Sequence, residues 1–367
     1  MKNSSCTHVA QISRLFQKSP KGFLTILSKQ IKFKNLNIGK TLKALVTGAT
    51  GFIGSHLAEA LLQRGDQVRC LLRNPADRKW LKGLPIEVAH GNCNDKTSLE
   101  SAVKGVDRVF HLAGVTKAVD EKTYFQVNAY GTDNLVHACL KHNPSLEKFI
   151  YLSSQAAAGP CRNGGQKKET DPCEPVSAYG RSKRMGEDFA LAHAEEFSLL
   201  ILRPSAVYGP RDRDIYTFFK FLSKGIKPSF YGEGHRVSLC YVEDVVQAIL
   251  LASETQKGSG EAFFLSDGQD YRMEEVSDIF AAAMGVDPIC IRIPEWMIYG
   301  VASLSETFSK LSGKPALLNR GKVEEMMQKN WVCDITKANM VLGFKPKVSL
   351  AEGARLTFNW YKKAKWL

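Results

Sequence analysis

The sequence lacks the long apolar run that a membrane-spanning helix requires. Its 367 residues are 44% hydrophobic and 24% charged, values typical of a soluble globular protein. The most apolar late stretch, residues 291–311, is interrupted by Arg292, Glu295, Glu306 and Lys310, whereas a span needs roughly 20 apolar residues. We therefore expect no integral membrane span, a large buried core and a cytoplasmic protein.

Metal-ligand and disulfide patterns are also missing. Nine cysteines are scattered along the chain without a C-x-x-C pair, and no histidines are paired at ligand spacing. This pattern argues against structural zinc and against a disulfide framework. We expect free thiols in a reducing compartment and no metal site.

Acidic residues are absent from residues 1–43, which contain nine Lys or Arg. Subtracting these nine from the formal net charge of +13 leaves +4 for the rest of the chain. The remaining sequence is therefore nearly balanced, and a basic face for nucleic acid is not indicated.

The first 41 residues show no clean periodicity, and we interpret them as a basic leader outside the fold. A composition rich in Ser and Lys and free of acids resembles an organelle transit peptide, but Arg14 is the only arginine. A flexible or weakly helical extension is the favoured interpretation, and organelle targeting is the alternative.

From Leu42 onward, apolar runs alternate with segments of helical periodicity, without internal repeats. This alternation predicts an α/β fold with a doubly wound parallel sheet. The expected strands are residues 44–47, 67–72, 86–89, 108–112, 149–153 and 199–202. The expected helices are residues 53–64, 96–103, 122–142 and 178–196, followed after Arg203 by 242–253, 273–284 and 350–361 in a looser mixture.

A glycine-rich turn follows the first expected strand. Residues 44–55 read ALVTGATGFIGS, with Gly48, Gly51 and Gly54 at spacings of three. A strand, a turn and a helix N-terminus in this order can seat the pyrophosphate of a dinucleotide, because backbone N–H groups and the helix dipole face the anion. A turn without a ligand is the alternative if the motif is considered alone.

The second expected strand ends without the acidic residue that would bind the ribose of NAD. Leu72 is followed instead by Arg73, with Arg78 and Lys79 nearby. Because a guanidinium can bind a 2′-phosphate through two hydrogen bonds, Arg73 favours NADP, with NAD as the alternative. Arg73 as a merely solvated loop residue also stays open.

Three further side chains point to proton transfer. Tyr179 and Lys183 are four residues apart, so they lie one turn apart on the same face of an expected helix. A nearby ammonium lowers the pKa of a tyrosine, which makes it a better acid-base group at neutral pH. Ser154 follows the apolar run FIYLS, at the end of a strand where ligands of open α/β sheets bind. Each residue alone has a structural explanation, such as surface decoration or a turn cap.

Together these motifs resemble the extended short-chain dehydrogenase/reductase superfamily, in the branch of NAD-dependent epimerase/dehydratases, 3-beta-hydroxysteroid dehydrogenases and dihydroflavonol-reductase-like enzymes. The resemblance covers about residues 42–365. The matching motifs are TGATGFIG (47–54), HLAG (111–114), VNAYGT (127–132), LSS (152–154), YGRSK (179–183), LRPSAVYGP (202–210) and YVEDV (241–245). It implies a Rossmann-type dinucleotide-binding domain at 42–203 and a smaller, interleaved C-terminal α/β substrate lobe at 204–367.

The resemblance also implies roles for individual residues. Ser154 would polarise the substrate oxygen, Tyr179 would transfer the proton, Lys183 would bind the nicotinamide ribose and Asn128 would support the site. Besides Tyr179, Lys183 and Arg73, the cofactor contacts would be Gly48, Thr50, Gly51, Phe52, Ile53, Gly54, Asn92, Cys93, Leu112, Ala113, Gly114, Pro204 and Val207. Besides Ser154, the substrate contacts would be Gln155, Tyr208 and Arg236.

Departures from the family pattern narrow the reaction. Gln155 and Ala156 stand where sugar dehydratases of the family carry an Asp-Glu pair, so dehydratase activity is not expected. Asn92 replaces an Asp that often contacts the adenine.

We therefore expect an NAD(P)-dependent oxidoreductase or epimerase that acts on a small molecule at a secondary alcohol or carbonyl. Trp296, Met297, Tyr299 and Phe308 favour a steroid or terpenoid-like substrate, although such aromatics usually belong to the lobe core. Arg211 and Arg236 favour a nucleotide sugar. A non-catalytic dinucleotide-binding protein is the alternative from another class, and a homodimer stays open.

Overall fold

The computed structural model describes residues 41–74, 78, 80–229, 234–316 and 318–367. Residues 41–367 form one compact unit. The leader, except for residue 41, lies outside the described residues, as does Lys79. The boundary between residues 203 and 204 stays a prediction.

A parallel sheet of seven strands forms the centre of this unit. The strands run in the order β11-β6-β5-β4-β1-β2-β3, and every neighbouring pair is parallel. Their bounds are β1 (Lys43–Thr47), β2 (Gln67–Leu72), β3 (Glu87–His90), β4 (Arg108–His111), β5 (Lys148–Leu152), β6 (Ser198–Pro204) and β11 (Glu261–Leu265). The Rossmann-type fold is therefore confirmed, and the six expected strands are present within two residues at each end.

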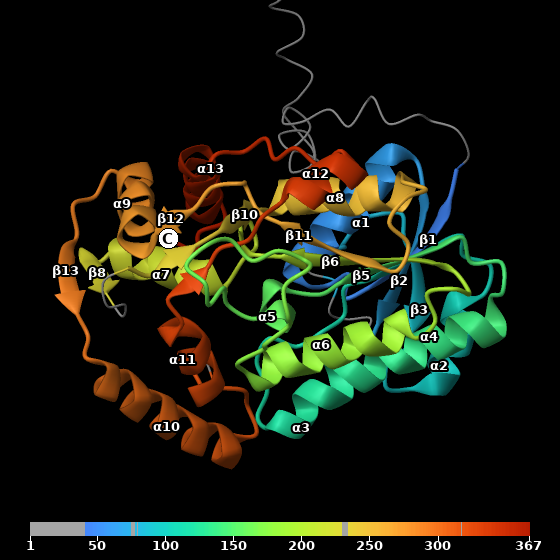
Figure 1. Ribbon diagram of the computed structural model, residues 1–367, viewed down its shortest axis with the longest axis horizontal. Coiled ribbons are helices and arrows are strands. Elements are labelled where there is room, and N and C mark those ends of the chain that lie inside the picture. Colours follow the sequence, from blue (N-terminus) through green and yellow to red (C-terminus); the bar gives the residue numbers. More distant parts are fainter. Residues whose placement is uncertain (1–40, 75–77, 79, 230–233, 317) are drawn as a thin grey trace, which may run out of the picture. The chain divides into compact units, whose positions relative to one another are not determined.

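Helices cover both faces of the sheet, as its apolar strands require (Figure 1). On one face, α1 (Phe52–Arg64) packs against α8 (Val242–Glu254), which also contacts α12 (Thr336–Leu342). The other face carries α2 (Lys96–Val103), α3 (Glu121–Tyr124), the π-helix η3 (Phe125–Tyr130), α4 (Gly131–His142), α5 (Gln155–Ala158) and α6 (Ala178–Leu191).

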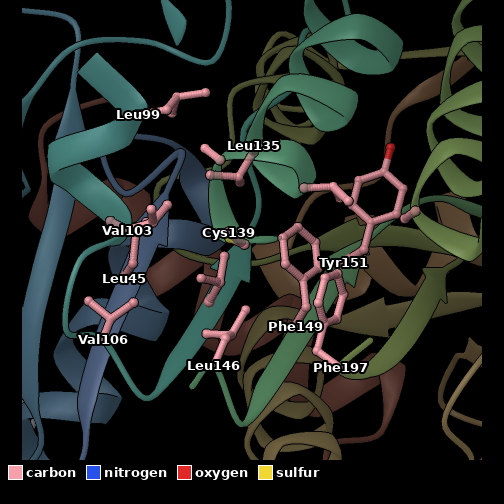
Figure 2. Close-up of a cluster of buried hydrophobic side chains, with 14 of the residues drawn as sticks. Leu45, Leu99, Val103, Val106, Leu135, Cys139, Leu146, Phe149, Tyr151 and Phe197 are labelled. Carbon is pink, nitrogen blue, oxygen red and sulfur yellow. The ribbon is translucent and has the colours of Figure 1, made fainter. Parts of the chain in front are cut away.

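The main core lies between the sheet and α2 and α4. Figure 2 shows Leu99 and Val103 of α2 together with Leu135 and Cys139 of α4 in the cluster that includes Phe149 of β5. All five side chains are buried. Burying side chains of this kind stabilises a fold by about 1.5–3 kcal/mol each, so this face fixes the strands that carry the site.

The part of the chain after β6 builds a second core and smaller sheets. The additional helices are α7 (Asp214–Leu222), α9 (Met273–Met284), α10 (Glu295–Ser312), α11 (Arg320–Met327) and α13 (Leu350–Lys363). The additional strands are β7 (Ala206–Tyr208), β8 (Ile226–Ser229), β9 (Arg236–Val237), β10 (Leu239–Tyr241), β12 (Tyr271–Arg272), β13 (Ile289–Arg292) and β14 (Asn330–Trp331). Tyr208, Phe219, Phe280 and Tyr361 meet in this second core.

Candidate active site

The site begins where the strand order changes direction. β1 lies between β2 and β4, so the chain leaves β1 toward one edge and later returns to its other side. Gly48 follows β1 with a φ of +70°, and a Cβ there would lie 2.6 Å from the Leu112 carbonyl oxygen. Only glycine lets the two turns approach so closely. Open α/β sheets bind their ligands at such a crevice.

The helix α1 begins directly after this glycine-rich turn. Gly51 is its N-cap residue and is exposed, no side chain caps the helix, and its first turn contains no acidic residue. Thr50, Phe52 and Ile53 are each partly exposed, while Gly54 is buried in the first turn. The first N–H groups of a helix have no intrahelical partner, so this end is an anion site that fits a dinucleotide pyrophosphate.

A buried hydrogen-bond chain supports the turn after β4. The Ala113 N–H donates to Thr47 Oγ1 (3.1 Å), which lies 2.7 Å from His111 Nδ1. His111 Nε2 lies 2.9 Å from Thr132 Oγ1, which donates to the Asn128 carbonyl (2.7 Å). Burial, helped by the charge of Lys183, lowers the pKa of His111 to about 3, so the ring is neutral. This series of hydrogen bonds holds Leu112 and Ala113 beside Gly48.

Asn128 holds the same loop from the other side. Its Oδ1 accepts from the Val115 N–H (2.8 Å), and its Nδ2 donates to the Val115 carbonyl (3.0 Å) and to Ser182 Oγ (2.9 Å). The side chain is completely buried. A Cβ on Gly114 would lie 3.1 Å from Asn128 Oδ1. Asn128 therefore acts through the loop and α6, as a positioning residue.

Lys183 extends from α6 into the buried space below this loop. Its Nζ donates to the Leu152 carbonyl (2.8 Å) and lies 4.2 Å from the centre of the Tyr151 ring. Burial lowers the pKa of Lys183 to about 7, although the carboxylate of Glu187 acts in the opposite direction. The amine is therefore poised between its two protonation states near neutral pH.

Tyr179 and Ser154 meet because α5 and α6 pack closely. Ser177 caps α6 by accepting from the Gly180 N–H (3.0 Å), and a Cβ on Gly180 would lie 2.4 Å from the Ala156 carbonyl oxygen. Ser154 caps α5 by accepting from the Ala156 N–H (3.1 Å), and its hydroxyl interacts with Tyr179, whose pKa it lowers. Two hydroxyl groups thus converge at the carboxyl end of β5.

The pKa of Tyr179 departs from our expectation. Burial raises it to about 12, and the hydrogen bond from Ser154 only partly offsets this effect. The expected lowering by Lys183 is absent, because that amine is itself desolvated and donates to the Leu152 carbonyl. The protein alone therefore keeps Tyr179 protonated, as an acid.

A cavity of about 350 Å³ opens beside Tyr179. Tyr124 and Tyr179 line it on one side, with ring centroids 6.3 Å apart, and Lys322 and Glu325 of α11 line the other. Asn319 Nδ2 donates to the Tyr124 hydroxyl (3.2 Å). A substrate oxygen entering this cavity would meet the Tyr179 hydroxyl.

Sequence reasoning missed four residues of this cavity: Tyr124, Asn319, Lys322 and Glu325. Glu325 accepts from the Ser177 hydroxyl and pairs with Lys322 Nζ (3.3 Å), which ties α11 to the start of α6. Ser177 and Glu325 are 148 residues apart in the sequence, so no local pattern could bring them together.

On the cofactor side, Arg73 is exposed directly after β2. Its charge lowers the pKa of the Cys93 thiol, against a larger increase from burial that brings the value to about 12. Arg73 and Cys93 therefore face the same region. Asn92 Oδ1 accepts from the Asn94 N–H (2.9 Å) in a local turn, so this oxygen is already engaged.

Three predicted residues lie at the ends of β5 and β6. Gln155 is buried, and its Nε2 has no hydrogen-bond partner among the described residues. Pro204 ends β6 and Val207 lies in β7, packed against the second core. The Gln155 amide, which lies next to Ser154 in the sequence, can therefore donate to a ligand at the carboxyl end of β5.

Tyr208 and Arg236, which were predicted to contact the substrate, do not line the cavity beside Tyr179. The Tyr208 ring is 1% exposed and packs against Tyr241 and Phe280, so it belongs to the second core. Arg236 forms an ion pair with Asp270, and neither lines the cavity beside Tyr179. Arg211 pairs with Glu59 (2.6 Å) and is likewise absent from that cavity.

The buried position of Tyr208 leads to a prediction about the free energy of unfolding. Its buried hydroxyl has no partner in the described part of the chain. Tyr208→Phe removes this desolvated group, so we expect the free energy of unfolding to rise by about 1 kcal/mol. Tyr361→Phe is the control, because that hydroxyl donates to the Asp212 carbonyl (3.0 Å) and its loss should destabilise by a similar amount. Urea denaturation measures both; a destabilised Tyr208→Phe would contradict the core assignment.

The glycine-rich turn after β1, the uncapped helix α1 and the converging hydroxyls are the arrangement expected of a dinucleotide-binding α/β protein. The chain belongs to the NAD dependent epimerase/dehydratase family, whose model matches residues 44–265. It is thereby a member of the extended short-chain dehydrogenase/reductase superfamily, and the resemblance seen in the sequence is confirmed.

Individual relatives act on different substrates. The chain is 31% identical to a ceramide reductase of Caulobacter vibrioides over 325 residues, 88% of this chain and 95% of the relative. It is 26% identical to a UDP-glucose 4-epimerase from Thermotoga maritima, solved with UDP-glucose, at a TM-score of 0.73 covering 88% and 100% of the two chains. MoeE5, solved with UDP-glucuronic acid and NAD, is 25% identical at a TM-score of 0.71, covering 88% and 99%.

Membrane-spanning helices and metal-ligand clusters are both absent from the described residues. No helix there is long and apolar enough to cross a membrane. No group of three or more His, Cys, Asp or Glu side chains in the same residues could hold a metal ion.

Proposed function

We propose that this protein is a nicotinamide-dinucleotide-dependent oxidoreductase acting at a secondary alcohol or carbonyl. The observation that carries the proposal is that Tyr179, which lines a cavity, interacts with Ser154 at the carboxyl end of β5, in a fold whose helix α1 has an uncapped N-terminus suited to pyrophosphate. When bound, the nicotinamide supplies or accepts the hydride. The proton chemistry falls to the side chains of the chain.

We propose a task for each of these side chains. Because Ser154 accepts from the Ala156 N–H, its own hydrogen is available to a substrate oxygen. Tyr179 is protonated and can donate to the same oxygen as a carbonyl is reduced. Lys183 lies one helical turn away with a pKa near 7, so it can exchange protons near neutral pH. Asn128 holds the loop after β4 in place through its two hydrogen bonds to the backbone of Val115.

The proposed substrate is a lipid-like alcohol or ketone, such as a steroid or terpenoid. Arg236, the residue that favoured a nucleotide diphosphate, is engaged by Asp270 away from the cavity. The similarity to a ceramide reductase supports the same choice. Epimerisation of a nucleotide sugar is the second candidate, favoured by the similarity to UDP-glucose 4-epimerase. Gln155 and Ala156 at the dehydratase positions argue against water elimination.

A substrate screen tests the proposal. Purified protein is incubated with NADPH or NADH and with sterol ketones, 3-oxo lipids and UDP-sugars, and nicotinamide absorbance is followed. We expect oxidation of the cofactor with a lipid ketone. Because epimerisation causes no net absorbance change, the UDP-sugar reactions are also analysed for products. Conversion of a UDP-sugar without conversion of any lipid ketone would contradict the proposed substrate class.

We further propose that NADP is preferred, because Arg73 is exposed after β2 and no acidic residue occupies the end of that strand. The family description and the neighbour MoeE5 name NAD, so the proposed preference rests on the residues of this chain after β2. We expect tighter binding of NADPH than of NADH, and a loss of about 1.5–3 kcal/mol of NADPH affinity in Arg73→Ala, the strength of a charge-assisted contact. Nicotinamide fluorescence titration measures both. Equal affinities in the wild type would refute the preference.

A further inference from the structure

The helix α10 carries two apolar faces, and only one of them is covered. Ile298 and Ala302 are buried against α11 with Val323. Our expectation that the aromatic residues of this region belong to the lobe core is therefore wrong: Trp296 is 75% and Phe308 73% exposed. Figure 1 shows α10 with α11 on only one of its sides.

The exposed residues form a continuous stripe along α10. The apolar stripe consists of Met297, Val301, Leu304, Phe308 and Leu311, at alternating spacings of four and three. This spacing keeps all five side chains on one face of the helix. Leu304 and Leu311 are 74% and 82% exposed. Ile289 and Ile291 of β13, which precede α10 closely in the sequence, are exposed as well.

The positions beside the stripe carry no charge. They are Gly300, Ser305, Thr307 and Ser312. In coiled coils, charged residues at these flanking positions determine the choice of partner. A coiled coil typically extends over three to four heptads. The 18 residues of α10 give fewer than three heptads, about 27 Å of helix. The residues of α10 therefore do not select a coiled-coil partner. Binding to lipid requires neither flanking charges nor this helix length.

Cations stand at both ends of the stripe. Arg292 ends β13, with two residues between it and α10, and Lys310 and Lys314 lie at the C-terminal end of α10; all three are exposed, and no ion pair involving them occurs in the described structure. Glu306, on the polar side, is engaged by Arg320 (3.7 Å). An apolar helix face that includes Phe308, with an exposed Trp296 at the start of the helix and with cations near its ends, is typical of a helix that lies in a membrane interface.

The same helix forms part of the cavity beside Tyr179. Glu306, Ser309 and Lys310 line that cavity, while the apolar stripe lies on another face of α10. We propose that the apolar stripe seats the protein on the surface of a lipid bilayer, with α10 lying in the interface rather than crossing it. The corollary that the substrate enters from that bilayer rests on the proposed function.

Vesicle flotation tests the proposal with the full-length chain. Vesicles of phosphatidylcholine, alone or mixed equally with phosphatidylglycerol, are floated with the protein without cofactor or substrate. We expect the wild type to float, more so with phosphatidylglycerol, and Leu304→Glu/Phe308→Glu to lower the bound fraction at least about tenfold. Met340→Glu is the matched control, because Met340 is 76% exposed on α12, away from the stripe. It should float like the wild type.

Other outcomes would overturn the proposal. The thermal midpoint and circular dichroism of each variant establish that it is folded. A folded Leu304→Glu/Phe308→Glu that floats like the wild type, or a wild type that does not float, contradicts a lipid interface. A wild-type dimer that this double variant converts to a monomer, without vesicle binding, assigns the stripe to a second copy instead. Because flotation needs no turnover, Tyr179→Phe should float normally, which separates failure of this inference from failure of the proposed function.

Discussion

Tyr179→Phe is expected to lower kcat by about 10²–10⁴-fold, the usual contribution of a positioned acid-base group. The ring contacts are retained, so the cavity and the packing against Tyr124 should persist. Only the hydroxyl that meets Ser154 is lost. Steady-state kinetics with the substrate found in the screen measures kcat, and fluorescence titration measures the cofactor dissociation constant, which should change less than about threefold.

The matched control is Tyr124→Phe. Tyr124 lines the same cavity, and its hydroxyl accepts a hydrogen bond from Asn319 but does not contact Ser154. We expect a smaller effect, mainly on KM. If Tyr179→Phe retained more than about a tenth of the wild-type kcat, the proton would have to come from another group, and the assignment of Tyr179 would be wrong.

Lys183→Met should abolish most turnover and also change how stability depends on pH. Burial lowers the pKa of Lys183 from 10.5 to about 7 in the folded protein. Between these values the unfolded chain keeps a proton that the folded chain has released, so the free energy of unfolding rises with pH, by at most about 1.4 kcal/mol per pH unit. Below pH 7 both states are protonated and the full penalty of a buried ammonium is present.

The methionine variant has no such penalty. We expect Lys183→Met to be more stable than the wild type below pH 7, with an advantage that shrinks as the pH rises toward 10.5. Urea denaturation over this pH range measures the effect. Lys141→Met, on the exposed side of α4, is the control and should keep the wild-type slope. A parallel pH dependence for Lys183→Met and the wild type would show that the lysine is not desolvated as described.

Much of the sheet and several helices could be predicted from local sequence. The helix predicted over residues 273–284 matches α9, because its apolar periodicity ends at Gly285, which takes the left-handed conformation. The glycines after β1 also predicted a close approach of the backbone, and the turn after β4 does come close to Gly48. In these cases the signal lies within a few residues of the structure it predicts.

Features that depend on distant contacts could not be predicted. The helix predicted over residues 122–142 is divided into α3, η3 and α4, around a π-helix in which Asn128 bonds to the loop after β4. β11 was missed because it pairs with β6, some 60 residues earlier in the chain. The sequence marks residues 291–311 as the most apolar late stretch, but it does not show which face of α10 is covered by α11.

The measurement that tests the central claim most directly is deuterium transfer from reduced cofactor labelled at C4 of the nicotinamide. The labelled NADPH is incubated with the wild type and with a panel of sterol ketones, 3-oxo lipids and 4-keto nucleotide sugars, and the products are analysed by mass spectrometry. The account predicts one deuterium on the carbon that carries the new hydroxyl, and almost none with Tyr179→Phe. Cofactor binding without deuterium in any product, or equal labelling by Tyr179→Phe, would contradict it.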